Sequence, residues 1–393
     1  MDDKQKNHLK AYGIAYWIIQ NGLEAQWLLN YRGGSFMCQY SETIKAECDL
    51  RGVSYDLLAD AKANAIIGQI SKPDENMDVV KLEKAPRMAV YSPKDKLPWD
   101  DAVTMALTYA EIPYDIIYDG EIIAGALKNY DWLHLHHEDF TGQYGKFYGA
   151  YRSAAWYQDQ VANAEQMAAE YGFAKVSELK LFIANSISNY VTNGGFLFAM
   201  CSGTDSFDIA LAAANTDICH QVFDRDPMAP DAQARLEYDR CFAFKDFTLV
   251  TNPLEYEFSN IDVTDTRKVR EEEDYFTLFE FSAKWDQVPT MLCQNHTSII
   301  KGFMGQTTAF NKDLVKSNVL IMGEFKAANE ARYIHGNMGK GTWTFYGGHD
   351  PADYRHYVGD PQTNLDNHKN SPGYRLILNN VLFPAAKKKP QKT

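Results

Sequence analysis

The sequence has no apolar run long enough to span a membrane. A spanning helix needs about 18 or more consecutive apolar residues, and the stretch 14–29 is interrupted by Gln20, Asn21, Glu24 and Gln26. No transmembrane segment is therefore expected. No signal peptide opens the sequence either, which predicts a cytoplasmic protein if Met1 is the native start and an exported or periplasmic protein if a leader has been removed.

Cysteine pairs and basic surfaces are also missing. The six cysteines include no Cys-x-x-Cys pair, which excludes a zinc knuckle and a thioredoxin-type motif, and no disulfide framework is expected in a chain of 393 residues. Lysine and arginine total 39 against 52 aspartates and glutamates, a formal net charge of −13, so no nucleic-acid partner is expected. The only basic run, Lys387-Lys388-Lys389, belongs to a predicted disordered basic tail over residues 387–393.

The composition and the residue pattern of the chain are those of a globular α/β protein. Hydrophobic residues make up 45% of it and charged residues 23%, which is enough for a large core. From about residue 86, strand and helix patterns alternate with short connections. This repetition is typical of a mostly parallel, flavodoxin-like sheet with helices on both faces. The predicted strands are 88–91, 114–118, 131–137 and 196–200, and the predicted helices are 100–110, 121–128, 157–171 and 179–190.

The regions before, within and after this alternating segment have other sequence patterns. Residues 1–85 are interpreted as an N-terminal α/β extension, mostly helical with a strand at 25–29, packed on the core. Residues 86–386 form the main domain. Within it, periodicity fades near 219–274, which looks like an irregular insertion on the sheet's edge. A hairpin and a last helix, which begins at Ser371-Pro372, close the domain.

One stretch has the pattern of a nucleophile elbow, the sharp strand-to-helix turn that presents a reactive side chain. The apolar strand 196–200 stops at Cys201, and a helix follows within about three residues. Ala199 and Gly203 are the small neighbours that such a turn requires. Backbone N–H groups near Ser202, at the start of the helix, would favour a thiolate and help to hold an oxyanion. Cys201 is therefore the candidate nucleophile.

Two further segments should end at the same edge of the sheet, where ligands bind in open parallel sheets. The strand 131–137 delivers His136, His137 and Glu138, and a later strand delivers His349 and Asp350. We interpret His349 as the general base, with Glu138 or Asp350 orienting or charging the site. The alternatives are an inert buried cysteine and a loop histidine bonded to the backbone.

The histidine-rich segment also allows a metal-site interpretation. His134 and His136 share one face of a strand and form a usable pair of ligands. A zinc or similar ion on that pair would support metal-dependent hydrolysis. Because the spacing places no third ligand, we expect no metal ion and no other cofactor.

These residues resemble those of the class I glutamine amidotransferase-like superfamily. The resemblance covers about residues 87–385 and is carried by four segments: Arg87–Ser92, Leu133–Phe140, Gly194–Ser202 and Gly339–Asp350. It is closest to Bacteroidetes-type proteins commonly labelled asparagine synthetase B, and a more distant likeness is to ThuA-like proteins. In the family the elbow reads G-x-C-x-G, and its cysteine attacks the side-chain amide of glutamine.

This chain departs from that family pattern at two places. Ala199 replaces the first glycine of the elbow, and His349-Asp350-Pro351 stands where the family has H-x-E. A true asparagine synthetase resembles an N-terminal-cysteine amidotransferase joined to an ATP-pyrophosphatase domain. This sequence has neither a cysteine at position 2 nor a Ser-Gly-Gly-x-Asp-Ser loop, so asparagine synthesis is not expected.

The resemblance implies an amidotransferase-like hydrolase or transferase that uses Cys201 on an amide or related acyl substrate. Ser202, Gly203, His136, His137, Asp350 and Trp132 would bind that substrate. The alternative is a non-catalytic, ThuA-like binding protein for a carbohydrate or other small polar ligand, with a cleft lined by Trp132, Tyr144, Phe147 and Tyr148. In both cases the partner is a small molecule.

Overall fold

A computed structural model describes residues 1–93, 101–264, 270, 273–302, 305–354 and 360–387. Residues 388–393 of the predicted basic tail and the first residue of the helix predicted at 100–110 lie outside these ranges. Within them, no helix combines the length and the apolar character needed to cross a bilayer.

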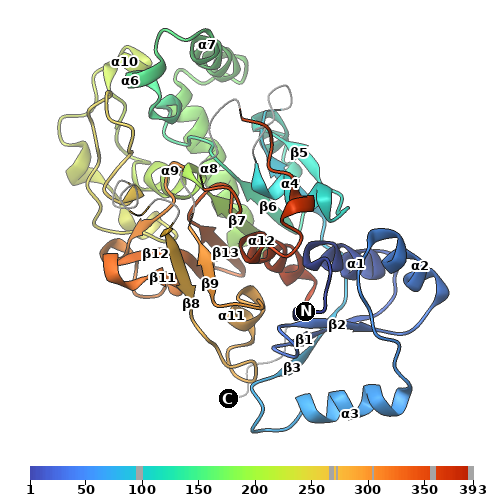
Figure 1. The fold of residues 1–393 in the computed structure, drawn as a ribbon. Coiled ribbons are helices and arrows are strands. Elements are labelled where there is room, and N and C mark those ends of the chain that lie inside the picture. Colours follow the sequence, from blue (N-terminus) through green and yellow to red (C-terminus); the bar gives the residue numbers. More distant parts are fainter. Residues whose placement is uncertain (94–100, 265–269, 271–272, 303–304, 355–359, 388–393) are drawn as a thin grey trace.

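A ten-stranded mixed sheet forms the centre of the protein (Figure 1). Its strands run in the order β5-β4-β6-β7-β13-β12-β11-β8-β9, and β10 pairs with β12. Their bounds are β4 Met88–Tyr91, β5 Asp115–Ile117, β6 Trp132–Leu135, β7 Phe196–Met200, β8 Tyr275–Leu278, β9 Ile299–Lys301, β10 Phe310–Asn311, β11 Leu320–Phe325, β12 Glu330–Met338 and β13 Gly341–Tyr346.

The first half of this sheet is parallel. β5, β4, β6, β7 and β13 pair with one another in parallel, which in chain order is 2-1-3-4-5, the order of flavodoxin-like sheets. From β12 onward every pairing is antiparallel. The order reverses between β4 and β6, and ligands bind at the carboxyl ends of strands beside such a switch point.

Helices cover both faces of the sheet, because alternate residues of each strand point to opposite sides. On one face, Phe196, Phe198 and Met200 join the core cluster that holds α1, α4 and α12. On the other, Leu197 and Ala199 join the cluster that holds α8 and α9. The helices are α1 His8–Gln20, α2 Glu42–Arg51, α3 Asp60–Ile70, α4 Ala102–Tyr109, α5 Asp119–Ile123, α6 Tyr148–Tyr151, α7 Ala155–Glu170, α8 Val176–Thr192, α9 Ser202–Ala212, α10 Gln221–Asp224, α11 Gln287–Leu292 and α12 Pro372–Leu382.

The N-terminal residues build a sheet of their own. β1 (Ala25–Leu29) lies between β2 (Ser35–Cys38) and β3 (Asp78–Leu82), and both pairings are antiparallel. α1 packs against α12 and α4 of the main domain, so this unit rests on one face of the large sheet (Figure 1). The sequence predicted the strand at 25–29 but neither β2 nor β3.

The irregular segment near 219–274 contributes to the core, which the prediction of an insertion on the sheet's edge did not anticipate. Phe242, Phe244, Phe247, Phe258 and Ile261 are fully or almost fully buried in the cluster shared with α8 and α9. The segment has little regular structure because its backbone is held by side chains instead. Asp208 of α9, for example, accepts hydrogen bonds from the backbone N–H groups of residues 242, 243 and 244.

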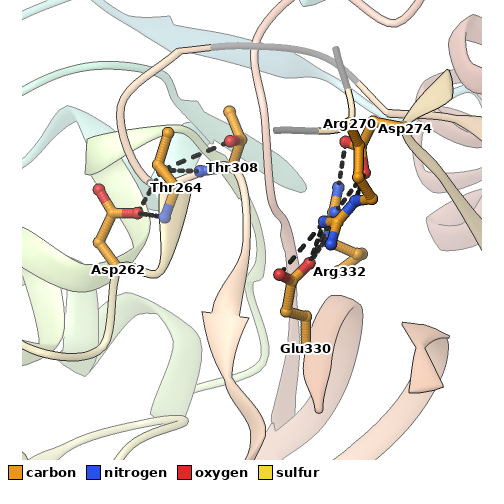
Figure 2. A network of polar contacts seen from close by, with 7 residues as sticks. All are labelled: Asp262, Thr264, Arg270, Asp274, Thr308, Glu330 and Arg332. Carbon is orange, nitrogen blue, oxygen red and sulfur yellow. Dashed lines mark hydrogen bonds and ion pairs between the residues drawn. The ribbon is translucent and has the colours of Figure 1, made fainter. Parts of the chain in front are cut away.

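A buried ionic quartet fixes the antiparallel half of the sheet (Figure 2). Arg332 of β12 donates to Asp274 at 2.9 and 3.2 Å and to Glu330 at 2.7 and 3.1 Å. Arg270 donates to the same two carboxylates, with its shortest contacts at 2.9 Å. Two guanidinium groups thus face two carboxylates, and this pairing offsets the cost of burying their charges.

Candidate functional site

Cys201 occupies the turn between β7 and α9 in a strained backbone conformation. Its φ is 50° and its ψ is −144°, and the side chain is 2% exposed. A non-glycine residue in this region costs about 1–3 kcal/mol and persists only where its surroundings enforce it. The elbow predicted from the sequence is therefore present as a local geometry.

Hydrogen bonds from two neighbouring loops enforce this turn. The Cys201 N–H donates to the carbonyl oxygen of Gly348 at 3.1 Å, and the Gly203 N–H donates to that of His136 at 2.7 Å. Thr204 donates to the Cys201 carbonyl from its N–H at 3.1 Å and from its hydroxyl at 2.6 Å. Only glycine fits at position 203, because a Cβ there would lie 2.3 Å from the His136 carbonyl oxygen.

The thiol lies beneath a short segment that the sequence did not point to. Cys201 Sγ donates to the carbonyl oxygen of Gln306 at 2.9 Å. The Gln306 amide donates in turn to the carbonyl oxygens of Gly145 and Tyr256 at 3.1 and 3.2 Å. A substrate that reaches the sulfur must therefore displace the Gln306 carbonyl.

Asp205, one helical turn after the thiol, holds the same segment in place. Its Oδ1 accepts a hydrogen bond from the Thr307 hydroxyl at 3.0 Å, while Asp262 accepts from the Thr307 N–H at 2.9 Å. Asp205 is fully buried and its Oδ2 has no hydrogen-bond partner. Burial, with the nearby Asp262 carboxylate, raises the pKa of Asp205 well above its usual range, which favours the protonated carboxyl.

Three histidines come together at the carboxyl edge of the sheet. His136 and His137 follow β6, and His349 follows β13. The ring centroids of His136 lie 4.4 Å from those of His137 and 4.9 Å from those of His349, and the outer two are 6.5 Å apart. One nitrogen from each ring lies within 4.8 Å of the other two. The sequence placed these residues at one edge, and the structure brings their rings into contact.

Asp101 links this group to His134. Its Oδ1 lies 3.2 Å from His134 Nε2 and 3.4 Å from His136 Nδ1, and it caps α4 by accepting from the Val103 N–H at 2.9 Å. His134 Nδ1 also lies 3.1 Å from the Phe198 carbonyl oxygen, so both of its ring nitrogens are engaged. Burial and the neighbouring histidines hold the pKa of His136 well below its usual range. Sequence analysis missed Asp101, although an aspartate capping a helix at the switch point was a signal that could have found it.

Glu138 belongs to a different polar cluster. It is half-buried, and burial raises its pKa to about 7 despite the nearby Lys180 ammonium. Lys180 of α8 donates to Asp119 at 3.0 and 3.2 Å, to Tyr91 at 2.9 Å and to Tyr118 at 3.1 Å. Glu138 therefore lies among the groups at the ends of β4 and β5.

The structure also places three other predicted site residues, namely Asp350, Ser202 and Trp132. The Asp350 Oδ1 accepts hydrogen bonds from the N–H groups of Ala352 and Asp353 and from the Tyr374 hydroxyl, at 2.9, 3.2 and 3.0 Å. Ser202 is fully buried, and its hydroxyl has no hydrogen-bond partner. Trp132 begins β6, is fully buried in the core, and so does not line a cleft at the carboxyl edge.

Comparisons with known proteins add distant structural matches. No protein-family model matches the sequence, and no curated protein matches it. Among solved structures, the cytoplasmic protein STM3548 from Salmonella typhimurium is 9% identical, with a TM-score of 0.36 over 77% of this chain and 100% of that one. The cytoplasmic protein STM1381 from Salmonella typhimurium LT2 is 11% identical, with a TM-score of 0.38 over the same shares of the two chains.

A third match is to part of a larger enzyme. Gan42B, a GH42 β-galactosidase, is 10% identical with a TM-score of 0.29, over 68% of this chain and 28% of that one. These values describe distant likeness only, and the chemistry of the site is argued from its own residues.

Proposed function

We propose that this chain is an amidotransferase-like hydrolase or transferase that attacks an amide or related acyl substrate with Cys201. The observation that carries the proposal is the conformation of Cys201, whose φ of 50° is kept at a buried strand-to-helix turn. Such strain recurs where a side chain is held for chemistry. A cysteine that served only for packing would gain nothing from it.

The surroundings of the thiol support acyl transfer. Cys201 immediately precedes α9, an eleven-residue helix whose first N–H groups carry partial positive charge and favour a thiolate. The Gly203 N–H is already bound to His136, so the Ser202 N–H is the better oxyanion donor. His349 follows the glycine that anchors the Cys201 backbone and is the base in this proposal.

A gate is part of the same proposal. The Gln306 carbonyl accepts the thiol proton in this state, and a carbonyl acceptor favours the thiol over the thiolate. Movement of that carbonyl would admit the substrate and release the sulfur together. The site therefore alternates between a covered, protonated cysteine and an open, reactive one.

Covalent labelling tests the nucleophile. The full chain is incubated with a diazo-ketone analogue of glutamine and with iodoacetamide, and the modified peptides are mapped by mass spectrometry. We expect both reagents to modify Cys201, and His349→Ala to slow that reaction about tenfold or more. Cys219→Ala is the matched control, because Cys219 is also buried and also donates to a backbone carbonyl, that of Thr141. Labelling confined to other cysteines, or unchanged in Cys201→Ala, would overturn the proposal.

A second candidate function is sugar binding, and one observation favours it. The rings of Tyr151 and Trp156 are more than 40% exposed and 5.1 Å apart, and both pack against Phe147, which reaches Tyr256 at 5.8 Å. Exposed aromatic faces beside a polar site suit carbohydrate stacking. Thermal shifts with a panel of sugars, and with glutamine and asparagine, separate the two functions. Sugar-specific shifts that disappear in Trp156→Ala would support this candidate.

A further inference from the structure

The three histidines at the carboxyl edge, with Asp101 behind them, form a group that acyl transfer does not explain. Acyl transfer needs one imidazole, whereas His136, His137 and His349 each place a ring nitrogen within 4.8 Å of the other two. Imidazole is the commonest metal ligand among side chains, and three ring nitrogens this close together suit a shared ion.

We propose that His136, His137 and His349 bind a divalent transition-metal ion of the zinc class, and that Asp101 orients His136 from the second shell. Neutral imidazole is a preferred ligand of zinc, with Zn–N distances of about 2.0–2.1 Å. Ligand nitrogens in a tetrahedral site then lie about 3.4 Å apart, so the rings present need to approach by at most about 1.4 Å. Rotation about the side-chain bonds supplies movements of that size.

The unsatisfied ring of His136 points independently to a ligand. The residue is 2% exposed, and neither of its ring nitrogens makes a hydrogen bond to any residue that the structure describes. Buried polar atoms are almost always paired, so an imidazole with two unsatisfied nitrogens at a ligand-binding edge needs a partner. A metal ion on Nε2 supplies one, and Asp101 Oδ1, 3.4 Å from Nδ1, supplies the other after a small approach.

Asp101 has the position of an outer-shell carboxylate. Metal-bound histidines commonly donate their second N–H to a carboxylate, which fixes the tautomer and the ring orientation. Asp101 is 1% exposed, and its Oδ2 has no hydrogen-bond partner. It contacts both His134 and His136 from the start of α4. His134 is not a ligand in this proposal, because both of its nitrogens already have partners.

Another group with metal-binding side chains serves as a contrast. Asp217, Cys219 and Asp224 also cluster, but the Lys175 ammonium lies 2.6 Å from Asp217 and 3.0 Å from Asp224. A cation is therefore already present there, and a second one would be repelled. In the three-histidine group, the charged side chain recorded against His136 is a carboxylate, that of Asp101.

The metal site goes beyond the proposed function and does not depend on it. Ligation uses the lone pair that a general base needs, so His349 cannot serve as ligand and base at once. The metal-loaded state and the acyl-transfer state are therefore alternatives. Metal affinity is measured without any reagent for the thiol, and thiol labelling is measured on metal-free protein, so each proposal fails by its own experiment.

The test is direct metal binding by the full chain. Protein stripped with a chelator and dialysed is titrated with zinc chloride by calorimetry and with cobalt chloride by absorption. We expect one ion per chain with an affinity at least micromolar, and a tetrahedral cobalt spectrum. His137→Ala, at a half-buried position that tolerates truncation, and His349→Ala should each weaken binding more than about tenfold. Asp101→Asn should weaken it about 10- to 100-fold without changing the stoichiometry.

Two matched controls make the result specific. His368→Ala removes a histidine that is not part of the three-histidine group, and Cys219→Ser alters the group that contains the Lys175 ammonium. Both should bind zinc as the parent does, and the melting temperature of every variant is checked without metal. Absence of binding by the parent chain, or parent-like affinity in folded His137→Ala and His349→Ala, would overturn the proposal.

Discussion

The Gly203 N–H donates a 2.7 Å hydrogen bond to the His136 carbonyl oxygen, so the elbow and the strand that carries the histidines touch backbone to backbone. This contact couples the candidate nucleophile to the candidate metal ligands. Any side chain at position 203 would separate them.

Gly203→Ala should therefore be severely destabilising. Its Cβ would lie 2.3 Å from the His136 oxygen and 3.2 Å from Leu135, in a part of the core that cannot easily yield. We expect a loss of about 3 kcal/mol or more in the free energy of unfolding, measured by urea denaturation. Gly68→Ala in α3 is the matched control, since nothing lies within 4 Å of its Cβ, and it should be stabilising by about 0.5–1 kcal/mol. Equal effects at the two positions would contradict the close approach.

Replacing Cys201 by two different small residues isolates the backbone strain. Both Cys201→Ala and Cys201→Gly remove the thiol, but only glycine adopts a φ of 50° without penalty. After allowance for the greater freedom of glycine in the unfolded chain, Cys201→Gly should be about 1 kcal/mol more stable than Cys201→Ala. Denaturant unfolding of the two variants measures the difference. A more stable alanine variant would show that the turn stores no strain.

Asp205 makes stability fall as the pH rises. Its folded-state pKa lies well above the unfolded value of about 3.9, so the folded chain keeps a proton that the unfolded chain releases. The stabilising effect of that proton is complete below about pH 4 and is lost as the pH rises toward the folded-state pKa. Asp205→Asn mimics the neutral carboxyl, so its unfolding free energy should match that of the parent near pH 4 and exceed it increasingly as the pH rises to 8. The test is the difference in unfolding free energy between Asp205→Asn and the parent, measured from pH 4 to pH 8. A difference that does not grow as the pH rises would contradict the raised pKa.

Arg332 should be far more costly to remove than an exposed arginine. Arg332→Met removes from the buried carboxylates of Asp274 and Glu330 the guanidinium that pairs with both of them, and Arg270 keeps its own contacts to the two. A loss of about 3–5 kcal/mol is expected. Arg225 pairs with Glu165 on the surface, and Arg225→Met should change stability by less than about 1 kcal/mol. Thermal and denaturant unfolding of both variants make the comparison, and similar losses would contradict a buried quartet.

The elements with strong local patterns were predictable from the sequence. The strands 25–29, 88–91 and 196–200 have the predicted bounds, because each is a run of apolar residues flanked by turn or helix signals. β3 was not predicted, since Asp78–Leu82 follows a polar stretch and is a strand only through its pairing with β1. Pairing between residues 49 to 57 positions apart leaves no local trace.

The site was predictable only in part, for a similar reason. The edge that gathers Cys201, His136, His137 and His349 follows from the parallel order of the strands. Gln306 could not be placed, because it reaches the site from a loop without periodicity, and Asp101 was missed although its place at a helix cap was a usable signal. The burial of five apolar side chains in the segment near 219–274 was missed because the segment has no periodic pattern, and part of its backbone, at residues 242–244, is held by the Asp208 carboxylate rather than by a repeating ladder. The five are Phe242, Phe244, Phe247, Phe258 and Ile261.

The two outermost strands of the large sheet bear on how the protein behaves in a crowded solution. β5 and β9 have only three residues each, and each carries an exposed charged residue, Asp115 in one and Lys301 in the other. Open sheet edges invite pairing with another chain, and short, charged edge strands discourage it. A sheet of ten strands thus ends on both sides in segments that are poor templates for aggregation.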